Sequence, residues 1–65
     1  MESLRKKYNL LLADDDPFIL EGIGEDLESN GYLVARASSG ESAVELLEST
    51  HFDLVITDLV MGKTS

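Results

Sequence analysis

The strongest constraint on this chain is a short apolar run that ends at once in three aspartates and a proline. Residues 8–13 read Tyr-Asn-Leu-Leu-Leu-Ala, and Asp14, Asp15, Asp16 and Pro17 follow directly. A run this short with so sharp a polar boundary favours a buried strand. Pro17 fits the first position of a helix, where the Asp16 side chain can accept a hydrogen bond from a free amide. The run therefore predicts a strand followed by a helix.

The residues after Pro17 have the spacing of an amphipathic helix. Its apolar side is formed by Phe18, Ile19, Ile23 and Leu27. Gly22 and Gly24 lie inside this segment, and each weakens a helix by about 1 kcal/mol. Asn30 and Gly31 form a helix stop. We expect the helix to end at this pair.

A second strand, a second helix and a third strand follow. Residues 32–37 read as a strand, and a helix then begins in which Ser38 and Glu41 have the spacing of a capping box. The inner side of this helix is expected to consist of Ala43, Val44, Leu46 and Leu47. The helix ends near His51, a polar or cationic C-terminal residue. Residues 53–58 have a continuous apolar centre, which suits a strand covered on both faces.

The order of elements predicts an α/β fold, βαβαβ, with a three-stranded parallel sheet. Right-handed crossovers place the first strand in the middle or next to both others. We expect residues 1–7 to be a disordered start, residues 8–62 to form one domain, and residues 63–65 to be a tail. The expected core residues on the helices are Phe18, Ile23, Leu27, Val44 and Leu47.

Composition excludes several classes of function. The 65 residues carry a net charge of −8 and contain no cysteine. Such an acidic surface repels phosphodiester backbones, so we expect no nucleic-acid partner. The apolar runs are far too short to span a membrane, and Arg5, Lys6 and Lys7 are not followed by the apolar segment of a signal peptide. A cytoplasmic protein of marginal stability is expected.

Carboxylates gather where two predicted strands end. Asp14, Asp15 and Asp16 follow the first strand, and Asp58 ends the third. In a parallel sheet both strand ends lie at one edge, where open α/β sheets bind ligands. Several carboxylates at one edge repel one another unless a counter-charge is present. A hard divalent cation supplies that charge, and Mg²⁺ fits an oxygen-only ligand set.

Three motifs resemble those of the receiver domain of two-component response regulators. They are Leu-Leu-Leu-Ala-Asp-Asp-Asp-Pro, which starts at residue 10, Ser-Ser-Gly-Glu-Ser-Ala from residue 38, and Leu-Val-Ile-Thr-Asp-Leu-Val-Met from residue 54. The resemblance covers about residues 9–61. It implies the first half of a flavodoxin-like receiver fold and a signalling module of a phosphorelay. We expect no enzyme, because the chain offers too few residues to enclose a substrate.

The resemblance also implies residue roles. Asp58 would be the phospho-acceptor, which takes a phosphoryl group from the phosphohistidine of a sensor histidine kinase. Asp15 would bind Mg²⁺ directly, Asp14 would bind it largely through water, and the backbone carbonyl of Val60 would add a further ligand. Phosphoryl transfer develops charge on the equatorial oxygens, and a metal neutralises it. Asp16 is expected to be a helix cap.

The chain departs from the family pattern in ways that leave an alternative open. Receiver domains have five strands, and the family's Ser/Thr after strand four and Lys after strand five would lie beyond Ser65. Gly62 stands where the family usually has proline. We expect a truncated receiver whose third strand, with Leu54, Val55 and Ile56, is a bare edge that favours a homodimer. The alternative is a remnant that self-associates and is not phosphorylated.

Overall fold

The computed structural model describes residues 7–57 of the 65-residue chain. Its elements, in chain order, are β1 (Asn9–Ala13), α1 (Pro17–Ser29), β2 (Leu33–Ala37), α2 (Gly40–Ser49) and β3 (Leu54–Thr57). The predicted βαβαβ order is confirmed. The predictions for Asp58, Val60 and the tail lie outside the described residues, as does most of the predicted disordered start. Within residues 7–57, no helix is long and apolar enough to cross a membrane.

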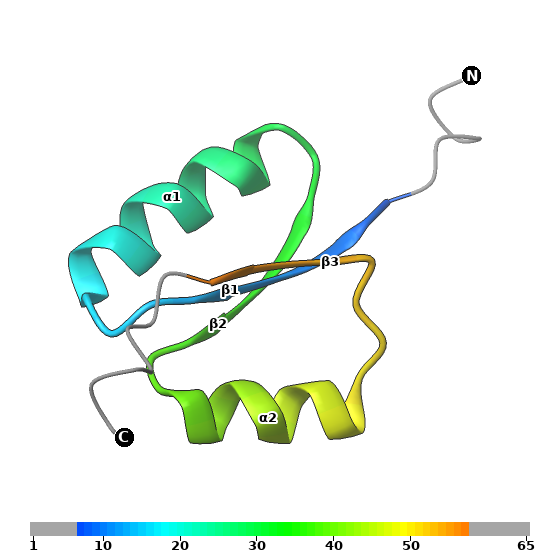
Figure 1. The fold of residues 1–65 in the computed structure, drawn as a ribbon. Coiled ribbons are helices and arrows are strands. Elements are labelled where there is room, and N and C mark those ends of the chain that lie inside the picture. The colour runs from blue at the N-terminus through cyan, green and yellow to red at the C-terminus, as the bar shows by residue number, and fades with distance from the viewer. Residues whose placement is uncertain (1–6, 58–65) are drawn as a thin grey trace.

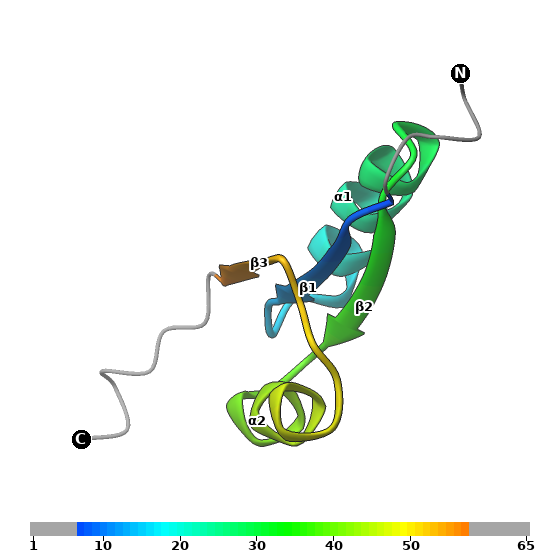
Figure 2. The same ribbon diagram turned by 90° about the vertical axis from the view of Figure 1, so that its right-hand side faces the viewer.

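The three strands form one parallel sheet with β1 in the middle. The strand order is β2-β1-β3, as the sequence predicts. The register pairs Leu11 with Ala35 of β2 and with Val55 of β3. Helix α1 covers one face of the sheet and helix α2 covers the other, while β3 forms an outer edge (Figures 1 and 2). All three strands therefore end at one edge of the sheet.

Helix α1 begins and ends at the predicted signals. The Asp16 side chain accepts a hydrogen bond from the backbone N–H of Phe18 at 2.9 Å, and Pro17 is the first helical residue. At the other end Asn30 is the C-cap, and Gly31 follows with a φ of 97°. This left-handed conformation favours glycine because a Cβ atom would be strained there. The chain can thus turn directly from α1 into β2.

The start of α2 differs from the prediction by one residue. The N-cap is Ser39 and not Ser38, and its hydroxyl accepts the backbone N–H of Ser42 at 3.1 Å. The Ser42 hydroxyl accepts the backbone N–H of Ser39 at 3.3 Å, which completes a capping box. The capping role that was predicted for Glu41 therefore belongs to Ser42. Ser42 lies three residues after Ser39, and its hydroxyl accepts the backbone N–H of Ser39.

The core lies on both faces of β1. On the α2 side it consists of Leu11, Ala13, Ala37 and Ala43, with Ala35, Leu46 and Phe52 packed against it. On helix α1 the buried residues are Leu20 and Gly24. Small residues at these contacts let each helix approach the sheet closely.

The expected core residues on the helices are largely wrong. Phe18 is 86% exposed, Ile23, Val44 and Leu47 are exposed as well, and Leu27 is half-buried. Both helices pack on β2 and β1 and have little contact with β3. Within residues 7–57, the apolar side chains at these positions therefore remain largely exposed to solvent, although their spacing is typical of the buried face of a helix.

An arginine fills the space between α1 and β2. Arg36 donates from Nε to the Leu20 carbonyl at 3.3 Å and from both terminal nitrogens to the Glu28 carboxylate at 3.2 and 3.3 Å. The hydrogen bond with Glu28 raises the pKa of Arg36 above its ordinary value, while burial opposes the shift. A Cβ atom on Gly24 would overlap this guanidinium group. The glycine that weakens α1 thus makes room for the arginine.

Replacement of each helical glycine by alanine tests this packing. Nothing lies within 4 Å of a Cβ atom built on Gly22, so Gly22→Ala should raise the free energy of unfolding by about 0.5–1 kcal/mol through helix propensity. Gly24→Ala should gain less, or lose stability, because the new methyl group displaces Arg36. Urea denaturation of the two variants measures the difference. Equal gains would contradict the placement of Arg36.

Candidate functional site

Asp14 occupies a buried position at the carboxyl end of the central strand. Its backbone N–H donates to the Ala37 carbonyl at 3.0 Å, which continues the β1–β2 ladder one residue beyond the strand. Its Oδ1 accepts the backbone N–H of Asp16 at 2.9 Å, and the residue is only 4% exposed. Because one carboxylate oxygen is held by this hydrogen bond, the side chain has a fixed orientation at the edge of the sheet.

The two following aspartates have different environments. Asp15 is exposed to solvent. Asp16 is half-buried and caps α1, and its carbonyl also accepts the backbone N–H of Leu20 at 3.1 Å. The prediction that Asp16 is a helix cap is confirmed. Of the three carboxylates, Asp15 is thus the one most open to an ion from solution.

The neighbouring strand ends at the same level. Thr57, the last residue of β3, pairs with Ala13, the last residue of β1. In the sequence each is followed by an aspartate, Asp14 and Asp58. Asp58 and Val60 lie outside the described residues, so the structure brings together the two strand ends but does not describe the predicted phospho-acceptor.

The predicted magnesium site is only partly described. Among residues 7–57, no three His, Cys, Asp or Glu side chains are close enough together to hold a metal ion. Asp14 and Asp15 are the predicted ligands in this range, and the other two, Asp58 and Val60, fall outside it. The donors at this edge are carboxylate oxygens, which suit a hard cation such as Mg²⁺. The metal site stays a prediction.

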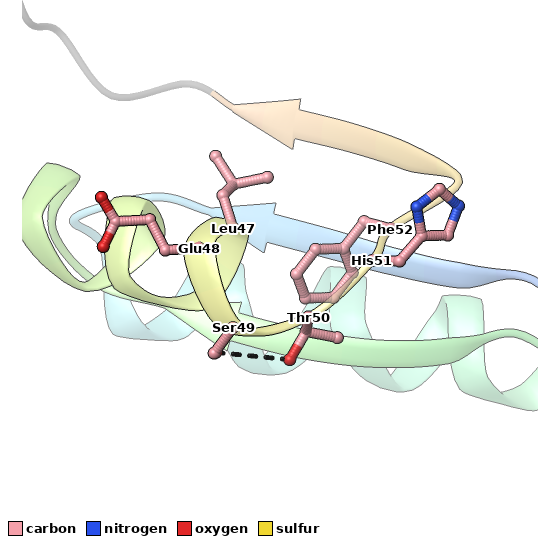
Figure 3. Close-up of a pocket in the computed structure, with 6 residues that line it drawn as sticks. All are labelled: Leu47, Glu48, Ser49, Thr50, His51 and Phe52. Atoms are coloured by element: carbon pink, nitrogen blue, oxygen red, sulfur yellow. Dashed lines mark hydrogen bonds between the residues drawn. The ribbon is translucent and has the colours of Figure 1, made fainter.

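A surface hollow lies at the opposite edge of the sheet. It has a volume of about 470 Å³ and is formed by the end of α2 and the loop to β3 (Figure 3), with the lining residues Leu47, Glu48, Ser49, Thr50, His51 and Phe52. His51 Nε2 lies 3.8 Å from Asp53 Oδ1, and the imidazole is largely exposed. The hollow is broad and open and is separated by the length of β1 from Asp14, so we assign it no part in the site.

Asp53 has a structural role that was not predicted from the sequence. The Asp53 side chain accepts the backbone N–H of Asn9 at 2.8 Å, and the Asp53 N–H donates to the Asn9 carbonyl at 2.8 Å. Together these bonds fasten the start of β3 to the start of β1. An aspartate directly before an apolar strand is the one sequence signal that could have indicated such a bond.

Comparisons with known proteins agree with the motifs at this edge. Residues 10–65 match the family described as response regulator receiver domain. The transcriptional regulatory protein GlrR of Escherichia coli (strain K12) is 46% identical over 58 residues, which are 89% of this chain and 13% of that protein. No solved structure has a significant match.

Two further relatives come from distant organisms. The heme response regulator HssR of Staphylococcus saprophyticus is 40% identical over 55 residues, 85% of this chain and 25% of that protein. The transcription factor SKN7 of Saccharomyces cerevisiae is 37% identical over 59 residues, 91% of this chain and 10% of that protein. The chain thus spans a quarter or less of the length of these curated relatives.

The different environments of Asp15 and Asp16 predict different effects on stability. Asp16→Ala removes the hydrogen bond to the Phe18 amide and should lower the free energy of unfolding by about 1 kcal/mol. Asp15→Ala should change it by less than about 0.5 kcal/mol, because the side chain is exposed. Urea denaturation in metal-free buffer measures both. An equal loss in the two variants would contradict the assignment of the cap.

Proposed function

Because the chain belongs to the response regulator receiver domain family, we propose that it is a receiver module of two-component signalling with its phospho-acceptor at Asp58. The observation that carries the proposal is the register of β1 and β3, in which Ala13 lies beside Thr57. An aspartate follows each of these residues in the sequence. The carboxyl ends of parallel strands are where such sheets bind ligands.

In this proposal the residues at the sheet edge divide the chemistry between them. An Asp58 carboxylate oxygen attacks the phosphorus of a kinase phosphohistidine, the P–N bond breaks, and the imidazole leaves. Asp15 would hold Mg²⁺ directly, Asp14 would hold it through water, and the Val60 carbonyl would complete the set. The metal, when bound, neutralises the charge that develops on the phosphoryl oxygens. Asp14 is already oriented by the Asp16 amide.

The expected partners of the chain follow from its family and from its net charge. The partner would be a sensor histidine kinase in the cytoplasm, and the module itself would accept a phosphoryl group without acting as an enzyme on other substrates. Direct contact with nucleic acid is disfavoured because the chain has a net charge of −8. The acidic surface favours cations and basic partners instead.

A second candidate function is self-association without phosphorylation. The observation that favours it is the exposure of the apolar side chains on β3, where Leu54 is 54% and Val55 is 41% exposed. An uncovered edge strand of this kind pairs readily with another chain. The two functions differ in whether Asp58 reacts.

Intact mass after incubation with acetyl phosphate and Mg²⁺ tests the phospho-acceptor. We expect a gain of one phosphoryl group, which is lost in Asp58→Asn and in the presence of EDTA. Asp15→Asn should also lose most of the gain, whereas Asp26→Asn, a change of an aspartate on α1, should retain it. Absence of any gain in protein shown to be folded by circular dichroism would reject the proposal.

A further inference from the structure

The turn between α1 and β2 contains an asparagine that is followed by glycine. The sequence has two asparagines, Asn9 and Asn30, and no glutamine, and of the two only Asn30 precedes a glycine, Gly31. Asn30 and Gly31 are both exposed and lie where the chain leaves α1 (Figure 1). The role of this pair as a helix stop depends on its backbone and does not involve the chemistry of the side-chain amide.

An asparagine side chain can react with the backbone of the residue that follows it. The backbone nitrogen attacks the side-chain carbonyl carbon, its proton leaves with the side-chain nitrogen as ammonia, and a cyclic succinimide forms. Water then opens the ring at one of its two carbonyls, which gives aspartate or isoaspartate. The reaction consumes only water. Glycine favours it, because a glycine has no Cβ atom to hinder the approach.

The conformation of the turn requires the residue that makes Asn30 most reactive. Gly31 has a φ of 97°, in which any residue with a Cβ atom would be strained. Nothing lies within 4 Å of a Cβ atom built on Gly31, so the space beside this residue is open. A side chain that would slow the attack is therefore disfavoured here by the backbone and not by its neighbours.

Hydrogen bonds engage both reacting groups in the folded chain. Asn30 Nδ2 donates to the Asp26 carbonyl at 2.8 Å, and the backbone N–H of Gly31 donates to the Glu28 carbonyl at 3.0 Å. The attack breaks both bonds, because the side chain must turn toward Gly31 and the backbone nitrogen must lose its proton. Two such bonds together should slow the reaction about tenfold or more.

We propose that Asn30 is a site of spontaneous deamidation, and that opening of the last turn of α1 controls the rate. The other asparagine provides the contrast. Asn9 lies in the central strand, its backbone N–H donates to the Asp53 carboxylate at 2.8 Å, and the residue that follows it, Leu10, is buried. Asn9 therefore stays intact while Asn30 reacts. The proposal does not depend on the chemistry of Asp58.

Deamidation would weaken the end of α1. The new carboxylate cannot donate to the Asp26 carbonyl as the Asn30 amide does, and its negative charge lies at the C-terminus of a helix, where the helix dipole disfavours it. Isoaspartate also adds an atom to the main chain of the turn, shortly before the Leu33 N–H donates to the Tyr8 carbonyl. The ratio of folded to unfolded chain should fall about fivefold or more.

Incubation of the 65-residue chain in mildly alkaline buffer, followed by proteolysis and mass spectrometry, tests the site. We expect exchange of the side-chain NH₂ group for a hydroxyl at Asn30 and not at Asn9. The rate should rise about tenfold or more in urea, where the hydrogen bonds of the turn are absent. Isoaspartate is detected by the methyl group that it accepts from an isoaspartyl methyltransferase. Gly31→Ala should slow the exchange in urea, where the strain of the folded turn plays no part.

Asn30→Asp measures the effect of the new charge on stability without the reaction. Urea denaturation should show the fivefold or greater loss in the ratio of folded to unfolded chain. The matched control is Ser38→Asp, which adds the same charge at an exposed position before α2 and should cause no such loss.

Three results would overturn the proposal: equal exchange at Asn9 and Asn30, equal rates in folded and unfolded chain, or no exchange in urea. Phosphoryl uptake at Asp58 is measured separately, because the carboxyl end of β1, where Asp14 lies, is the opposite edge of the sheet.

Discussion

The structure depends on the burial of β1 on both faces and along both edges. Residues Leu10 to Ala13 are at most 4% exposed, and β1 has a parallel neighbour on each side. Four consecutive apolar residues can be buried in this way only if helices cover both faces, which α1 and α2 do (Figure 2). The polar residues directly after Ala13 are then forced to the edge of the sheet, where Asp14 and Asp15 lie.

The cover that surrounds β1 does not extend to β3. Both helices pack on β2 and β1, and Arg36 links α1 to β2 through the Leu20 carbonyl and Glu28. Strand β3 is held by its ladder to β1 and by the hydrogen bonds between Asp53 and Asn9. The same asymmetry accounts for the apolar residues on the helices and on β3 that are exposed within residues 7–57.

Local signals predicted most of the fold, and tertiary contacts decided the rest. The strands, the Asp16 cap and the stop at Asn30 and Gly31 could be predicted because each depends on a few adjacent residues. The buried sides of the helices could not be predicted, because their rotation depends on Arg36 lying over Gly24 and on Ala43 packing against the sheet. The capping box moved to Ser39 and Ser42, since two adjacent serines offered two possible starts.

The sequence predicted where the candidate site lies but not the environment of its side chains. A parallel sheet brings the ends of β1 and β3 together whatever residues follow, and the pairing of Ala13 with Thr57 confirms this part. The burial of Asp14 and its bond to the Asp16 amide had no signal in the sequence, because they depend on the turn that the chain makes between β1 and α1. The resulting asymmetry between a fixed, buried Asp14 and an exposed Asp15 supports the proposed division of metal binding between them.

The most direct test of the central claim, that the adjoining ends of β1 and β3 form a cation site, is paramagnetic broadening of amide NMR signals by Mn²⁺. Manganese prefers the same carboxylate and carbonyl oxygens as Mg²⁺. If the cation binds there, signals of residues 13–16 and 57–59 broaden first, Mg²⁺ competes with Mn²⁺, and Asp15→Asn removes the broadening. Broadening that instead spreads evenly over the glutamates of α1 and α2 would contradict the claim.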